Sequence, residues 1–134
     1  MTGCPNSRAQ NLTGVWHGLY TYPQGVEGVS FVATLIETTS ALTGTTHEPC
    51  RVGPGGTLYA TVSGSRRDSA VAFMKTYDGS NPFYRTVAYE GTLSSDCTEI
   101  EGRWIVPGSW SGRFLMIRPQ SKSAMVSRKA HLRA

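Results

Sequence analysis

Two potential metal ligands stand three residues apart in the segment His-Glu-Pro-Cys, which runs from His47 to Cys50. Protein zinc sites use three or four ligands, commonly arranged as two pairs along the chain. No second pair of histidine or cysteine residues follows at such a spacing. The sequence therefore predicts no metal site and no cofactor, and we interpret His47 and Cys50 as loop residues.

A catalytic serine has no better support. The segment Gly-Ser-Trp-Ser-Gly, residues 108–112, has the outline of a nucleophile elbow, but its central residue is Trp110 instead of serine. An elbow also joins a strand to a helix, whereas Pro107-Gly108 predicts a hairpin turn. The acids Glu37 and Glu90 are single strand residues that we expect in solvent. We predict no catalytic residue, and an enzyme is the least favoured of three interpretations of function.

The elements that would position any site are β-strands. Apolar and polar residues alternate with a period of two, and clusters of Gly, Pro, Asp, Asn and Ser separate the alternating stretches. The low charged fraction, 16%, also fits strands and turns better than helices. Because the connections are short, we predict an all-β fold, an eight-stranded antiparallel up-and-down barrel. The predicted strands cover residues 12–22, 28–38, 41–47, 57–65, 69–77, 83–93, 98–106 and 110–118.

A glycine flanked at two residues on each side by larger residues recurs on several of these strands. Since side chains alternate between faces, all three members of each triplet share one face. Around Gly102 the other face carries charged residues, so the glycines are predicted to point inward. Inward glycines relieve crowding where a barrel wall bends. The triplets are Leu12-Gly14-Trp16, Leu42-Gly44-Thr46, Tyr89-Gly91-Leu93, Ile100-Gly102-Trp104 and Trp110-Gly112-Phe114.

The predicted inward face is mostly apolar with a few hydroxyl groups, which is typical of ligand pockets and equally of a plain core. Alternation alone leaves open whether the barrel is hollow or filled, although Gly18 favours a cavity because it removes a side chain from the wall. Our first functional interpretation is a protein that binds a small, largely apolar or aromatic molecule. The predicted contacts are Tyr20, Tyr22, Phe31, Tyr89, Trp104, Phe114 and Met116.

The Gly-x-Trp sequence at Gly14 and Trp16, at the start of the first predicted strand, resembles the signature of the calycin group, which includes lipocalins, fatty-acid-binding proteins and avidins. The resemblance implies that Trp16 closes one end of the barrel under an arginine from the last strand. Arg118 is in phase with the inward residues of that strand and is the expected partner; Arg113 points the other way. An arginine over an indole is a favourable contact.

Within that group, the segments Asn-Leu-Thr-Gly-Val-Trp (11–16) and Ala-Leu-Thr-Gly-Thr (41–45) look most like avidin strands. The residues that the resemblance assigns to biotin are not matched, because Gly18, Tyr22 and Thr46 stand where avidins carry asparagine, serine and tyrosine. We therefore expect an avidin-like fold without biotin binding.

The net charge of +4 lies entirely in the last residues, on Lys122, Arg128, Lys129 and Arg133. A neutral body does not indicate a nucleic-acid-binding domain. No apolar run is long enough for a membrane span. We predict a flexible segment at 1–10, one barrel domain at 11–118, and a basic flexible tail at 119–134 that folding does not require.

The second functional interpretation is a structural or interaction module with a filled barrel. Outward positions on the first, second and last strands could form an apolar patch, and exposed patches often mark oligomer contacts. A homo-oligomer is therefore an open alternative to a small-molecule partner. The patch would consist of Leu19, Val32, Ile36, Leu115 and Ile117.

The three cysteines, Cys4, Cys50 and Cys97, are too few for a disulfide framework, which indicates a cytoplasmic protein. A bacterial lipoprotein in the periplasm is the alternative, because Thr-Gly-Cys at residues 2–4 resembles a lipoprotein processing site. In the predicted barrel Cys50 and Cys97 lie at opposite ends. Only a Cys4–Cys97 bond is therefore geometrically open.

Overall fold

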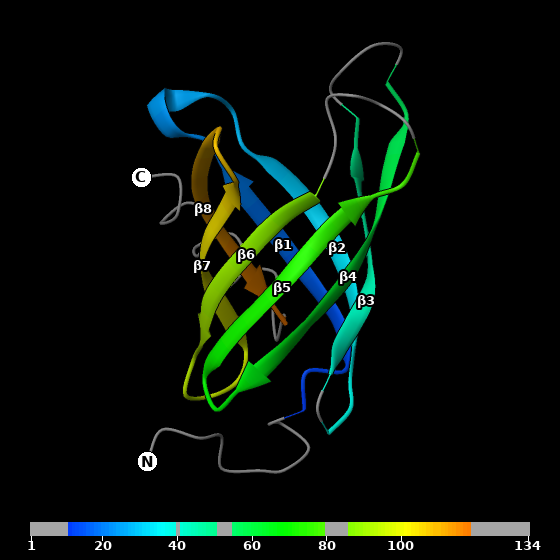
Figure 1. Cartoon of the computed structure of the whole chain (residues 1–134), viewed down its shortest axis with the longest axis vertical. Helices are drawn as coiled ribbons and strands as arrows, with labels where there is room; N and C mark the ends of the chain where they lie inside the picture. The colour runs from blue at the N-terminus through cyan, green and yellow to red at the C-terminus, as the bar shows by residue number, and fades with distance from the viewer. Residues whose placement is uncertain (1–10, 40, 51–54, 80–85, 119–134) are drawn as a thin grey trace.

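A computed structural model describes residues 11–39, 41–50, 55–79 and 86–118 (Figure 1). Their eight strands form one closed antiparallel barrel in which every strand pairs with its neighbour in sequence and β8 pairs with β1. The predicted fold class is confirmed. The strands are β1 (Gly14–Thr21), β2 (Val29–Glu37), β3 (Leu42–Pro49), β4 (Thr57–Arg67), β5 (Ala70–Tyr77), β6 (Thr86–Leu93), β7 (Glu99–Val106) and β8 (Trp110–Ile117), with a short 3₁₀ turn η1 (Pro23–Gly25) after β1.

Each predicted strand corresponds to an observed one, and most boundaries agree within about two residues. The difference with the greatest consequence is at β3, which continues to Pro49 and pairs with β4 along its whole length. His47 and Glu48 are therefore strand residues and do not belong to a loop as the sequence had indicated. Because side chains alternate, Glu48 points into the barrel while His47 points out.

The barrel has two unlike ends, which we name after a tryptophan at each. The Trp16 end, at the bottom of Figure 1, carries the β2–β3, β4–β5 and β6–β7 connections. The Trp110 end, at the top, carries η1 and the β3–β4, β5–β6 and β7–β8 connections.

The Trp16 end is closed as the resemblance implies. Trp16 is fully buried, its indole N–H donates to the Leu12 carbonyl at 2.9 Å, and the Arg118 guanidinium lies over its ring at 4.4 Å. Burial lowers the pKa of Arg118. The expected Trp16–Arg118 contact is confirmed, and Arg113 instead pairs with Glu101 on the outside.

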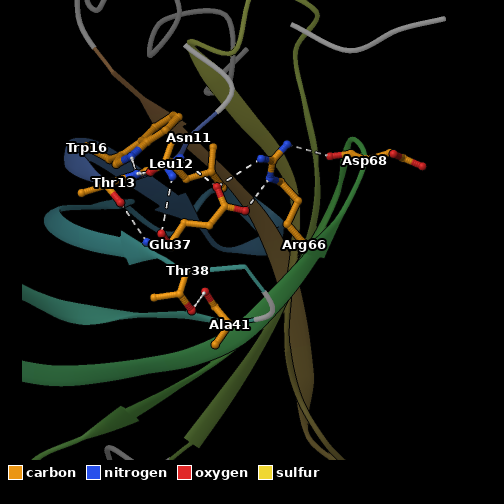
Figure 2. Close-up of polar contacts among 9 residues, drawn as sticks. All are labelled: Asn11, Leu12, Thr13, Trp16, Glu37, Thr38, Ala41, Arg66 and Asp68. Atoms are coloured by element: carbon orange, nitrogen blue, oxygen red, sulfur yellow. Dashed lines mark hydrogen bonds and ion pairs between the residues drawn. The ribbon is translucent and has the colours of Figure 1, made fainter. Parts of the chain in front are cut away.

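Glu37 ties the chain before β1 to this end of the barrel (Figure 2). Its carboxylate accepts from the Leu12 amide at 2.9 Å and from two nitrogens of Arg66 at 2.8 and 3.1 Å. Its own amide donates to the Thr13 hydroxyl at 2.9 Å. The sequence had placed this acid in solvent, but the network holds it largely buried.

The interior is filled to a large extent by aromatic side chains in mutual contact. Phe73 and Tyr89 stack with ring centres 4.9 Å apart, and Phe114 meets Tyr89 edge-on at the same distance. Glycines allow the strands around them to approach closely: a side chain at Gly102 would begin 1.9 Å from the Glu90 carbonyl oxygen of β6. This contact explains why a strand that must bend carries glycine at its centre.

The apolar outer patch expected from the sequence is not an exposed surface. Leu19, Leu115 and Ile117 point away from the barrel interior, yet they are buried and form a second apolar cluster across β1 and β8. Ile36, by contrast, is about half exposed. The expectation of a continuous exposed patch was therefore wrong, because Leu19, Leu115 and Ile117 are buried.

Cys97 is disulfide-bonded and Cys50 is not. Cys97 lies in the β6–β7 connection at the Trp16 end, whereas Cys50 follows β3 at the Trp110 end, as the predicted topology requires. The expectations for Cys4, for segment 1–10 and for the tail 119–134 lie outside the described residues. Within the described part of the chain, no helix is long and apolar enough to cross a membrane.

Candidate functional site

A buried ion pair lies inside the barrel. The Lys75 ammonium donates to Glu48 Oε1 at 2.6 Å, and each side chain is only 1% exposed. Lys75 comes from β5 and Glu48 from β3, so the pair spans the inner face of β4, which lies between them. Charged side chains are almost never fully buried unless they are paired. This pair is the most unusual chemical feature of the described residues.

Two tyrosines also donate hydrogen bonds to the Glu48 carboxylate. The hydroxyl of Tyr20 donates to Glu48 Oε2, and that of Tyr77 donates to Oε1 at 2.9 Å. Burial, followed by the nearby ionisable groups, raises the pKa of both tyrosines far above the ordinary value of 10.0. Both phenols therefore stay protonated and act as donors at any ordinary pH.

Aromatic rings enclose the ammonium of Lys75. Its nitrogen lies 4.6 Å from the ring centre of Phe31, 4.9 Å from Tyr77, 5.0 Å from Tyr20 and 5.6 Å from Tyr89. Ring faces attract cations, and more strongly where water is excluded. The cage therefore offsets part of the desolvation of the charged amine, although burial still lowers the pKa of Lys75.

A groove in the barrel wall lies next to Glu48, although the side chains of the ion pair are almost fully covered. The pairing between β2 and β3 stops at Val32 and His47, and toward the Trp110 end the two strands diverge (Figure 1). A groove of about 330 Å³ lies at this opening. Phe31 and Glu48 line it from the inside, together with rim residues His17, Ser30, Val32, His47, Pro49, Gly56 and Thr57. The wall therefore has its opening beside the buried carboxylate.

An unsatisfied hydroxyl lies on the same wall. Thr46 is buried two residues before Glu48 on β3, and its Oγ1 makes no hydrogen bond. Its neighbours across the sheet are Ala33 and Ala60, both small and buried. Buried polar atoms without a partner are uncommon in folded proteins. Thr46 therefore adds an unused polar group to this side of the interior.

The predicted contact residues fall into three groups. Tyr20, Phe31 and Tyr89 surround Lys75, as described above. Phe114 and Met116 are fully buried in the packed core. Tyr22 and Trp104 lie at the Trp110 end, where Tyr22 stacks on Trp110 at 4.9 Å and the Trp104 indole donates to the Thr21 carbonyl at 2.8 Å.

Gly18 does not create a cavity as its sequence position suggested. A side chain there would begin 2.2 Å from the ring of Phe31, the neighbour of Gly18 on β2. The space above Gly18 is therefore occupied by that ring. Phe31 lines the groove, and its ring centre lies 4.6 Å from the Lys75 nitrogen.

The sequence interpretation missed Glu48, Lys75 and Tyr77, although alternation could have indicated them. Lys75 is in phase with Val71 and Phe73, and Glu48 is in phase with Leu42. The predicted end of the third strand at residue 47 concealed the position of Glu48. Within the described ranges no three His, Cys, Asp or Glu residues gather as a metal site would require.

Comparisons with protein-family models, with curated proteins and with solved structures gave no match.

Proposed function

We propose that this protein binds a small molecule with an aromatic or apolar body, which enters the barrel wall between β2 and β3. The observation that carries the proposal is the groove of about 330 Å³ at the opening between β2 and β3, which Phe31 and Glu48 help to line. Its size falls within the range of known small-molecule sites. Its lining combines the apolar side chains of Phe31, Val32 and Pro49 with the polar side chains of His17, Ser30, His47, Glu48 and Thr57.

The ligand's apolar part would lie against Phe31, Val32 and Pro49. Its polar group would meet the Glu48 carboxylate or the Thr46 hydroxyl. Because Glu48 already accepts bonds from Tyr20, Lys75 and Tyr77, a ligand donor would find the carboxylate held in place. Such preorganisation lowers the entropy lost on binding.

The closed Trp16 end supports the resemblance to calycins, and we propose a calycin-like barrel. Trp16 and Arg118 are arranged as that resemblance implies. The interaction-module alternative loses its main support, because the centre of the expected outer patch is buried.

The disulfide at Cys97 favours an oxidising compartment over the cytoplasm, because structural disulfides persist in such compartments. We therefore propose export from the cytoplasm. Fractionation of cells that express the native gene tests this proposal: recovery only in the cytosolic fraction would contradict it.

Calorimetric titration with naphthalenemethanol, an aromatic alcohol, tests ligand binding. We expect saturable binding to the wild-type protein. Ser30→Phe places a bulky side chain on the exposed groove rim and should weaken binding at least tenfold, about 1.4 kcal/mol. Thr61→Phe, an exposed change on β4 outside the groove, should leave it unaltered. Absence of binding, or equal binding by the two variants, would contradict the proposal.

A further inference from the structure

The lysine inside the barrel is chemically distinct from the cations outside it. Lys75 is the only lysine in residues 1–118, and all other Lys or Arg positions in this range are arginine. Arginine does not lose its proton in proteins, whereas lysine can lose it and become a nucleophile. Among the Lys and Arg residues of this range, only Lys75, which faces the aromatic interior, has an amine that can lose its proton.

Stability alone does not explain the pair. Replacing a buried ion pair by apolar residues of similar volume is often neutral or stabilising, so a buried pair is weak evidence for a stabilising role. Lysines that are buried beside a specific partner and next to a cleft are candidates for function. Lys75 meets this description, because its partner Glu48 lines the groove.

We propose that Lys75 captures small aromatic aldehydes from the groove as a protonated imine, with Glu48 as its counter-ion. This inference rests on the proposed function and names the reactive class of its ligand. The Lys75 ammonium passes one proton to Glu48, and the neutral amine attacks the carbonyl carbon. The carbonyl oxygen leaves as water, and the proton returns to the imine nitrogen. Ammonium and aldehyde thus give protonated imine and water, with no change in net charge.

Three features of the site favour this reaction. Glu48 is one of the residues that line the groove, and its Oε1 lies 2.6 Å from the amine of Lys75. Burial lowers the pKa of Lys75, and each unit of lowering raises the fraction of neutral amine about tenfold. The rings that surround the ammonium, with Phe31 nearest at 4.6 Å, would equally surround a cationic imine.

Reductive trapping on the full-length protein tests the proposal. The protein is incubated with naphthaldehyde and sodium cyanoborohydride, which reduces an imine to a stable amine, and is then digested and mapped by mass spectrometry. The other lysines of the chain, Lys122 and Lys129, and the amino terminus are internal references. We expect Lys75 to be labelled faster than Lys122 and Lys129, because burial lowers its pKa and so raises its neutral fraction. Labelling of Lys75 no faster than theirs would overturn the proposal.

Two sets of controls test whether labelling depends on the buried position of the lysine and on access through the groove. Arg103→Lys adds an exposed lysine to β7 and should label at the reference rate. Ser30→Phe should slow labelling of Lys75, whereas Thr61→Phe should not. If naphthalenemethanol binds but naphthaldehyde is not trapped on Lys75, imine capture is wrong and the proposed function stands. If neither compound engages the groove, both proposals fail.

Discussion

The guanidinium of Arg118 lies 4.4 Å from the ring centre of Trp16, at the end of the barrel that Glu37 and Arg66 also close. The first and last strands thereby meet through side chains as well as through their backbone pairing. Two nitrogens of Arg118 are buried without a hydrogen-bond acceptor, so its contact with Trp16 is made mainly through the ring.

Trp16→Ala should destabilise the protein by about 3–5 kcal/mol, because a large, fully buried aromatic side chain is removed. Trp110→Ala is the matched control: Trp110 is 48% exposed, and the expected loss is clearly smaller. Chemical denaturation of both variants measures the free energy of unfolding. Equal losses would show that Trp16 does not anchor the closed end.

Removing one member of the buried pair should be far worse than replacing both. Glu48→Gln or Lys75→Met alone should lower the free energy of unfolding by about 3–5 kcal/mol, because a charge is left buried without its partner. The double variant should be more stable than either single variant. A double-mutant cycle from denaturation curves measures this coupling, and additive losses would contradict it.

Two glycines should respond differently to alanine. At Gly18 the added methyl group meets the Phe31 side chain, so Phe31→Leu should restore part of the stability that Gly18→Ala removes. At Gly102 it meets the backbone of β6, so Gly102→Ala should destabilise by about 1–3 kcal/mol or more. Phe31→Leu should not rescue that second variant. Melting temperatures of Gly18→Ala and Gly102→Ala, each measured with and without Phe31→Leu, test the contrast.

High pH should unfold the protein through its buried tyrosines. Tyr20, Tyr77 and Tyr89 have folded-state pKa values raised above the ordinary 10.0, chiefly by burial. Their contribution to stability is fully present below pH 10 and is lost as the pH rises above it, because only the unfolded chain then releases these protons. Tyrosinate absorbance and circular dichroism are followed together as the pH rises. The buried tyrosines should ionise only together with loss of the circular dichroism signal of the fold.

Peptide mapping under non-reducing conditions should not recover a bond between Cys50 and Cys97. The two residues lie at opposite ends of the barrel, and a disulfide requires Cα atoms within about 7 Å. Protein denatured before oxidation is the control, because the unfolded chain can form any pairing. Recovery of the Cys50–Cys97 bond from native protein would contradict the topology.

Strand number, strand order and the identity of the inward face followed from the sequence alone. The closed end at Trp16 and Arg118 was expected only from the resemblance to calycins, whereas alternation with a period of two and turn residues at short spacing specify neighbouring antiparallel strands. These signals are local, because each depends on residues within one strand or one turn. For that reason they were readable without a structure.

The site was decided by tertiary structure. That Glu48 and Lys75 meet depends on the register of β3, β4 and β5, and the access to them depends on where β2 and β3 stop pairing. The same register places the ring of Phe31 over Gly18, so a residue whose sequence position favoured a cavity instead makes room for a side chain. The buried cluster of Leu19, Leu115 and Ile117 likewise depends on β1 meeting β8. Alternation specifies a face but neither the partner across the barrel nor the length of the pairing, which closure of the sheet determines.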